Sequence, residues 1–326
     1  MTATLPQEIQ EVFDRLITTE YTTVDRAGQP ITWPVTPYYS PGDRCIDITT
    51  GLGYPKKADD AAGNPKVALL FSDPTGSGLQ RPPQVLIQGI AEVDDRDLAA
   101  NRERYARESI VKLPGTKRLL PPKPLRRMFG WYFTRIYVHV RPERVYVWPD
   151  GDPAAEPQLL DAHLEEVRSG HDEEPEGPPP PVTGEEPVWD ERIDQLGDRY
   201  ETAVLSVVAP DGFPFSIRLP ISVDRQAQRI RIGSGALGIP LASGLACVTA
   251  HDHHPDFTWQ RNFQVRGDLV AEDDGWALVP HKLVGGFELP PGSTLDGYRR
   301  NARKMMRFRR NAKRRLRRGK ASNSRN

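Results

Sequence analysis

The sequence has few of the residues that build disulfide frameworks, zinc sites or membrane spans. Cys45 and Cys247 are its only cysteines in 326 residues, and no CxxC or Cys/His zinc spacing occurs. No segment approaches the roughly 18 apolar residues of a membrane-spanning helix, and the first ten residues lack the basic region and apolar run of a secretion signal. We therefore expect a protein of a reducing, cytoplasmic compartment.

The sequence also lacks the common motifs of nucleophilic, metal-dependent and nucleotide chemistry. It contains no GxSxG, no HExxH and no Walker motif. This absence excludes the enzyme classes that depend on those motifs and leaves chemistry carried by a bound cofactor, in which the protein supplies orientation and charge. No catalytic side chain is assigned from the sequence.

Charge is distributed unevenly along a chain whose formal net charge is zero. Residues 297–326 contain 14 lysines and arginines and no acid, which leaves 30 basic and 44 acidic residues in the rest of the chain. The tail and the body therefore carry opposite charges. At 326 residues the chain exceeds what one hydrophobic core usually organises, so we expect two domains.

Strand patterns dominate the body of the sequence. A helix is expected at about residues 5–17 and another at about 95–110, and alternating or continuous apolar runs between 20 and 148 predict strands. The acidic, proline-rich range 151–188 reads as a linker. The predicted domains are therefore residues 1–150 and 189–296, followed by a basic tail at 297–326 that forms a helix and then a disordered end.

The second unit repeats the first. "DRAGQPITWPV" has its counterpart in "APDGFPFSIRLPI", with Gly28 matching Gly212 at an offset of 184 positions. "VLIQGIAEVDD" matches "FQVRGDLVAEDD", with Gly89 opposite Gly267 at an offset of 178, so the second copy is six residues shorter between these points. The missing residues fall where the first copy carries lysines.

The stretch "TTGLGYPKKADD" after a predicted strand has the residue types of a phosphate site. Threonine hydroxyls, glycine amides and one ammonium supply several donors and a compensating charge. Thr49, Thr50, Gly51 and Lys57 are therefore the candidate cradle. The same letters also fit a solvated turn that follows an ordinary strand.

The order of these elements resembles the pyridoxamine 5'-phosphate oxidase-like split β-barrel family, which includes flavin- and deazaflavin-dependent reductases. The resemblance covers residues 5–148 well and rests on "TTG.....K......NPKV", "V.I.G.AEV" and "RIYV.V.PERVYVW"; as in that family, Lys57 precedes Pro65 by eight residues. Residues 189–290 resemble the fold more weakly. The resemblance implies a mainly β fold of two tandem split β-barrels with flanking helices.

The resemblance also implies a cofactor and a reaction. We expect FMN or the deazaflavin coenzyme F-420, with its ring across Trp33, Val35 and Thr36 and with Gln88 near its polar atoms. The expected function is hydride transfer to or from a small unsaturated or aromatic compound, at one intact site between the two barrels. The alternative is a non-catalytic protein that holds a flavin, a deazaflavin or haem. Whether two chains also form a homodimer is left open by the tandem repeat.

Two further features admit several interpretations. The cluster "HDHHPDF" places His251 and His253 on one face of a strand, and with an aspartate these could bind a metal or haem; a polar turn explains the same residues, and we predict no metal site. The tail has an apolar stripe within a basic helix, which fits binding of nucleic acid or of an anionic membrane by residues 298–320, or docking on the acidic body of the chain. The stripe consists of Tyr298, Ala302, Met305, Ala312 and Leu316.

Overall fold

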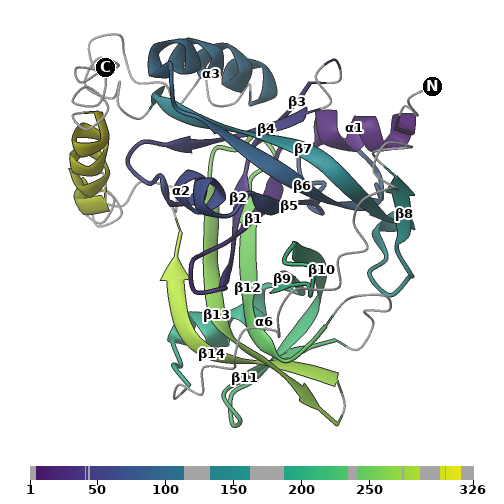
Figure 1. Ribbon diagram of the computed structural model, residues 1–326. Helices are drawn as coiled ribbons and strands as arrows, with labels where there is room; N and C mark the ends of the chain where they lie inside the picture. The colour runs from purple at the N-terminus through teal and green to yellow at the C-terminus, as the bar shows by residue number, and fades with distance from the viewer. Residues whose placement is uncertain are drawn as a thin grey trace.

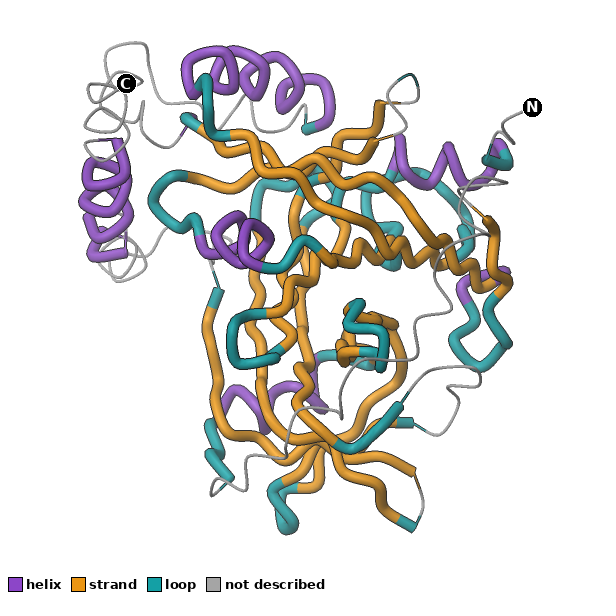
Figure 2. Tube along the Cα trace, in the orientation of Figure 1, coloured by secondary structure: helices purple, strands orange, loops and turns teal. Residues whose placement is uncertain are grey.

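The protein is mainly β, with two barrels and a few helices at their edges (Figure 1; Figure 2). The structure is a computed structural model, and it describes residues 5–40, 42, 45–113, 133–161, 187–233, 241–273, 275–286, 302–304 and 306–316. The expectation of two tandem split β-barrels is confirmed, because the strand order of each half, given below, is the same.

The first barrel is a curved sheet whose two edge strands follow one another in the chain. Its strands follow the order β2-β1-β5-β6-β7-β4-β3. The end strands β2 and β3 are separated by Thr36 alone, so one bent segment closes the ring. The strands are β1 (Thr19–Val24), β2 (Pro30–Val35), β3 (Pro37–Ser40), β4 (Cys45–Gly51), β5 (Lys66–Phe71), β6 (Gln84–Asp94) and β7 (Arg135–Trp148).

Three helices flank this barrel. In α1 (Gln7–Arg15), Ile9, Val12 and Phe13 lie on one face and are buried, which seals one end of the barrel core. The short helix α2 (Lys56–Gly63) follows β4, and α3 (Leu98–Lys112) follows β6. The sequence reading found α1 and α3 but treated the α2 segment as a turn.

The second barrel is closed by hydrogen bonds in the order β10-β11-β14-β13-β12-β9. Helix α6 (Glu191–Arg199) occupies the place of α1. The strands are β9 (Thr202–Val208), β10 (Pro214–Asp224), β11 (Arg229–Ile232), β12 (Gly244–His253), β13 (Gln260–Glu272) and β14 (Gly275–Gly285). Thus β9 corresponds to β1, the single strand β10 to β2 plus β3, and β11–β14 to β4–β7.

The glycines that match in the sequence have matching roles in the structure. Gly28 and Gly212 have φ angles of 79° and 80°, a conformation that glycine adopts without steric cost in a tight turn. The β6–β7 register shifts at Gly89 and the β13–β14 register shifts at Gly267. An added Cβ would lie 2.4 Å from a backbone oxygen at Gly89 and closer still at Gly267, so both bulges need glycine.

The barrels pack around an approximate two-fold axis, which four buried hydroxyls mark. Thr22 and Thr32 come from the first barrel, and their counterparts Ser206 and Ser216, each 184 positions later, come from the second. Thr22 lies 2.8 Å from Ser216, and Thr32 donates to Ser206 over 2.7 Å. Within each barrel the paired hydroxyls are 2.8 Å apart. The repeat therefore builds an internal pseudo-dimer.

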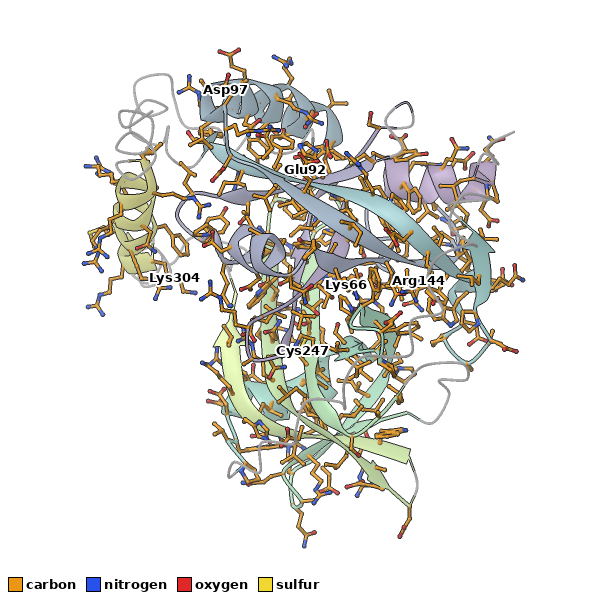
Figure 3. All side chains as sticks on the ribbon, viewed as in Figure 1. Lys66, Glu92, Asp97, Arg144, Cys247 and Lys304 are labelled. Carbon is orange, nitrogen blue, oxygen red and sulfur yellow. The ribbon has the colours of Figure 1, made fainter. Side chains whose placement is uncertain are left out.

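Polar contacts at the rim support this packing. Lys66 donates to the Asp211 carbonyl over 2.8 Å, and Arg144 forms an ion pair with the Asp211 carboxylate at 2.5 Å. Figure 3 labels Lys66 and Arg144 near the contact between the two barrels.

One sequence assignment changes. Strand β8 (Gln158–Asp161) pairs with β7, so the sheet of the first barrel extends into the range 151–188 that the sequence assigns to a linker. Residues 162–186 lie outside the described part, as do Tyr298 and Met305 of the tail. Within the described residues, no helix is both long and apolar enough to cross a membrane.

Candidate functional site

A cavity of about 490 Å³ lies between the two barrels and the helical residues 302–304 and 306–316, called the C-terminal helix below. This volume falls in the range of small-molecule and cofactor sites. The first barrel supplies most of the wall. The lining includes Thr18, Trp33, Val35, Thr36, Thr49, Tyr54, Lys57, Tyr105 and Arg135 from the first barrel, Phe257, Asn262, Arg266 and Gly286 from the second, and Lys304, Arg307 and Phe308 from the C-terminal helix.

The wall of the cavity carries positive charge only. Its lining residues include six lysines and arginines, and no aspartate or glutamate is among them. A concave surface of this kind concentrates positive potential and attracts anions. Lys56 has two carboxylate partners, Asp60 at 2.9 Å and Asp25 at 3.7 Å. The cavity is therefore built for a negatively charged ligand.

Lys57 lies in the first turn of α2 and faces the cavity. Its side chain is partly buried, and its ammonium lies 6.0 Å from the centre of the Tyr54 ring. Burial, and then the charge of Arg135, lower the pKa of Lys57 from 10.5 to about 8. In the described part of the chain, no carboxylate lies within ion-pair distance of this ammonium. A bound anion would supply the charge compensation that the protein leaves out.

Arg135, at the start of β7, provides a second buried cation beside Lys57. It donates to the Tyr54 hydroxyl over 2.6 Å and to the Tyr105 hydroxyl over 3.0 Å. The Tyr105 ring lies 4.4 Å from the guanidinium, so the group is held in a fixed plane. Both hydroxyls are neutral, so these contacts orient the guanidinium without cancelling its charge.

The predicted cradle is only partly assembled at the cavity. Thr49 and Lys57 line it, whereas Thr50 and Gly51 do not. Successive side chains of a strand point to opposite faces, and Thr50 is fully buried, with its hydroxyl donating to the Tyr54 carbonyl over 3.0 Å. An added Cβ at Gly51 would lie 2.8 Å from the Tyr54 ring. Thr50 and Gly51 thus shape the turn that presents Tyr54.

The predicted ring-contact residues divide in the same way. Trp33, Val35 and Thr36 line the cavity along the bent strand that closes the first barrel. Gln88 does not: it is buried between the barrels, and its amide donates to the Pro214 carbonyl over 3.0 Å. Arg266, its counterpart in the repeat, lines the cavity instead. The reason is that the cavity is lined by strands of both barrels. It contains Arg266 from β13 of the second barrel, whereas the equivalent strand β6 of the first barrel, which carries Gln88, lies elsewhere in the contact between the barrels.

The position related to the cavity by pseudo-symmetry is filled. Gly286 lines the cavity, and the register places its counterpart at Trp148. Trp148 is fully buried, and its ring packs edge-on against Phe215 of the second barrel with centroids 6.1 Å apart. A side chain of this size occupies the space that glycine leaves open on the other side. The difference accords with a single intact site.

The C-terminal helix docks on the chain and forms one wall of the cavity. The Phe308 ring packs against the Tyr54 ring with centroids 5.1 Å apart and planes tilted by 57°, and the Asn311 amide donates to the Gly53 carbonyl over 3.2 Å. Ala312 is fully buried in the core of the first barrel, and Arg315 forms ion pairs with Asp59 and Asp95. Figure 3 shows Lys304 on this helix. Binding of nucleic acid or of an anionic membrane by residues 298–320 stays a prediction.

Sequence reasoning missed most of the cavity wall. Tyr54, Arg135 and Tyr105 come from the first barrel, and Arg266 and Phe308 come from elements more than 200 residues away from Lys57. One signal was available: Arg135 begins the alternating run "RIYVHV", which places it on the outer face of β7 next to Gly51. The other residues depend on how the two barrels and the tail pack.

The comparisons with known proteins give structural likeness alone. No family model matches the sequence. No curated protein matches it either.

Three of the solved structures that match are low in identity, and each covers a little under half of this chain. A protein from Clostridium acetobutylicum, related to general stress protein 26 and described as of the pyridoxinephosphate oxidase family, is 13% identical over 47% of this chain and 92% of its own, with a TM-score of 0.32. An F420 reductase is 16% identical over 43% and 98%, with a TM-score of 0.33. HutZ, the heme storage protein from Vibrio cholerae, is 15% identical over 44% and 95%, with a TM-score of 0.30.

Each of these proteins therefore spans the length of about one barrel of this chain. The strand order of the structure itself establishes that the chain holds two split β-barrels in tandem.

Proposed function

We propose that the cavity binds FMN or coenzyme F-420 and that the protein is an oxidoreductase, which transfers hydride to or from a small unsaturated or aromatic compound. The observation that carries the proposal is the charge of the cavity: six cations and no carboxylate line a pocket of about 490 Å³ between two barrels. The sequence resemblance supports it independently, because it places Lys57 at the position of a phosphate-binding lysine.

In this proposal the phosphate lies at the Lys57 end of the cavity. Lys57 and Arg135 supply the charge, and the Thr49 hydroxyl supplies a neutral donor. The hydrogen bonds from Arg135 to Tyr54 and Tyr105 hold its guanidinium before ligand binds, so little reorganisation is needed. Arg266 and Arg307 are available for further anionic groups of the ligand.

The ring would lie against the bent strand of the first barrel. Trp33 and Val35 offer apolar surface there, and Thr36 lies where the chain bends from β2 into β3. When bound, a flavin or deazaflavin supplies hydride chemistry. The protein would bind the ring in one orientation, exclude water with Phe257 and Phe308, and leave a face for the second substrate. No protein nucleophile is required.

The test is an absorption titration of the full chain with FMN and then with coenzyme F-420, followed by turnover measurements with the ligand that binds. We expect a saturable spectral change with one site per chain. An oxidoreductase then gives cofactor-dependent oxidation of a reduced nicotinamide or other hydride donor. Saturable binding without turnover over a panel of unsaturated and aromatic acceptors would instead favour the non-catalytic flavin-, deazaflavin- or haem-binding alternative.

A further inference from the structure

The C-terminal helix has two faces that differ in composition. Its inner face consists of buried and half-buried side chains that recur at helical spacing, Lys304, Phe308, Asn311, Ala312 and Arg315. Its outer face carries the exposed cations Arg303, Arg307, Arg309, Arg310, Lys313 and Arg314. Figure 3 shows side chains that end in nitrogen projecting from this helix away from the barrels. The proposed cofactor site uses Arg307 and leaves the other outer cations without a role.

The inner face accounts for the docking of the helix on the acidic body of the chain. The Lys304 ammonium donates to the Gly286 carbonyl over 3.1 Å, and Arg315 forms ion pairs with Asp59 and Asp95. Docking on the body is one of the interpretations that the sequence left open for the tail. It applies to this face, and the outer cations take no part in it.

The outer cations have no counter-charge within the described part of the chain. The described helix contains no acid, and no carboxylate of the described residues lies within ion-pair distance of these cations, whereas Arg315 on the inner face has two such partners. Arg309 and Lys313 are four residues apart, and so are Arg310 and Arg314. Like charges at this spacing repel on a helix, and an anionic partner would relieve the repulsion.

The outer cations form a row that matches the charge of a nucleic-acid strand. Around Met306, a groove of about 420 Å³ is lined by Arg309, Arg310, Lys313 and Arg314. At the rise of an α-helix, the row from Arg303 to Arg314 is about 16 Å long. One strand of a duplex presents about five phosphates over that length. With Arg307 assigned to the cavity, five cations remain to meet them.

The composition of the outer face argues against a membrane. A helix that lies on a bilayer inserts an apolar face between the lipid headgroups. Here Phe308 and Ala312 are turned towards the protein, and Met306, which is 65% exposed, lies among the outer cations. Ala302 and Leu316, which the sequence placed on one stripe with Ala312, are exposed while Ala312 is buried. The predicted stripe therefore does not form one face.

The same composition argues against a protein partner and against the reading of bases. The centre of a protein–protein interface is depleted of charge and built around aromatic or apolar anchors, of which the groove offers Met306 alone. Proteins that bind single strands stack the bases on aromatic rings. Phe308, the aromatic residue of the described helix, packs against Tyr54 instead. A row of arginines and lysines suits phosphates, and contacts with phosphates carry no sequence information.

We propose that the outer face of the C-terminal helix binds the phosphate backbone of double-stranded nucleic acid without sequence preference, through Arg303, Arg309, Arg310, Lys313 and Arg314. The docked inner face holds these cations in place before the partner binds, which reduces the ordering cost. Outside residues 297–326 the chain has 30 basic and 44 acidic residues, so the duplex is confined to this surface. The proposal needs no ligand in the cavity and does not rest on the proposed oxidoreductase activity.

The test is fluorescence anisotropy of the full chain with a labelled DNA duplex of mixed sequence, at salt concentrations from about 50 to 200 mM. Five phosphate contacts predict an association constant that falls by about 10²-fold to 10³-fold over this range, with a slope of about −4 to −5 in a double-logarithmic plot. A second duplex of unrelated sequence should bind equally well.

A charge-neutral variant identifies the surface. Replacing Arg309, Arg310, Lys313 and Arg314 together by Gln keeps helix propensity and leaves the inner face intact. This variant should bind at least about tenfold more weakly at low salt, with a slope smaller by about three to four. The variant Arg309→Lys/Arg310→Lys/Arg314→Lys, which keeps the charge, should bind like the wild type.

The matched control neutralises as many exposed cations on the two barrels, by changing Arg96, Arg141, Arg225 and Lys282 to Gln. It should leave affinity and slope close to those of the wild type. The proposal is overturned by the absence of saturable binding to the wild-type chain, or by equal losses in the two Gln variants. It is also overturned if vesicles of phosphatidylserine and phosphatidylcholine bind at least as tightly as the duplex at equal concentration of negative charge, which would assign the surface to a membrane.

Discussion

Lys57 combines a cavity position, a lowered pKa and the absence of a carboxylate partner in the described chain. These properties are those of a residue whose charge is used by a ligand rather than by the fold. Neighbouring Lys56, with two carboxylate partners, provides the contrast.

Ligand binding should depend on pH through Lys57. Its pKa of about 8 in the free protein means that the ammonium loses its proton as the pH rises through 8, and a bound anion favours the protonated form. The dissociation constant for FMN should therefore be constant below about pH 7 and rise up to tenfold per pH unit above pH 8. Fluorescence titrations between pH 6 and 9.5 measure this. Lys57→Met should remove the rise, and a rise that persists in that variant would assign it to another group.

The hydroxyl cluster at the pseudo-two-fold axis gives a second prediction. Thr32→Val removes a hydroxyl that donates to Ser206 and contacts Thr22, and it leaves buried polar partners unsatisfied. The free energy of unfolding should fall by about 1–3 kcal/mol. Thr23→Val is the matched control, because the Thr23 hydroxyl is equally buried but has no hydrogen-bond partner in the described chain. Chemical denaturation measures both, and equal losses in the two variants would contradict the role of the cluster.

At the residue scale, the sequence predicts the site residues of the first barrel better than the site residues that the second barrel contributes. Thr49 and Lys57 follow from a strand and the polar stretch after it, and the family resemblance adds Trp33 and the spacing of Lys57 to Pro65, all within one barrel. Gln88 was predicted at the cavity, yet its repeat counterpart Arg266 lies there, because the packing of the barrels decides which copy faces the site. Thr50 failed for a simpler reason: strand alternation turns it into the core.

Among the elements, the C-terminal helix was the least predictable. Its basic composition fits several partners, and only the structure shows Ala312 in the core and Phe308 against Tyr54. Helix α2 was missed because eight residues that include KKADD and two alanines give no apolar periodicity to detect. By contrast, the repeat and its two pairs of matching glycines could be found in the sequence, because each feature occurs twice at nearly the same offset.

The docking of the C-terminal helix depends on one glycine. An added Cβ at Gly53 would lie 2.6 Å from Phe308 Cβ and 2.8 Å from the Phe308 carbonyl oxygen. Gly53→Ala should therefore displace the helix and expose its amides, with hydrogen exchange at 306–316 faster by at least tenfold. Gly63→Ala, where nothing lies within 4 Å of the added Cβ, is the control. Unchanged protection in Gly53→Ala would show that the helix is held elsewhere.

On the scale of the whole molecule, the two copies of the repeat pack against each other as the two halves of a pseudo-dimer, and the cavity lies at their contact. One side of that surface is open at Gly286 and the other is filled by Trp148. The two copies have diverged at this pair of positions, which explains why a cavity is found on one side of the contact between the barrels and a buried tryptophan on the other.

The buried charges between the barrels predict acid sensitivity. The pKa values of Glu20 and Asp73 are lowered in the folded protein against the cost of burial, by Arg218 and His251. The unfolded chain therefore takes up protons on these carboxyls at a higher pH, and the stability they contribute is present at neutral pH and lost as the pH falls from about 4 towards 2. Glu20→Gln should flatten the stability profile in this range, as measured by denaturation at each pH. Asp211→Asn, at a half-exposed interface ion pair, should change it little.

The most direct test of the central claim pairs Lys57 with the phosphate of the ligand. Affinities of FMN and of riboflavin, which lacks the phosphate, are measured for the wild type, Lys57→Ala and the exposed control Lys282→Ala. If Lys57 binds the phosphate, wild type and control should favour FMN by about 10-fold to 100-fold, as expected for a charge-assisted hydrogen bond, and Lys57→Ala should lose most of that preference. An equal preference for FMN in all three proteins, or no binding of either ligand or of coenzyme F-420, would contradict the account.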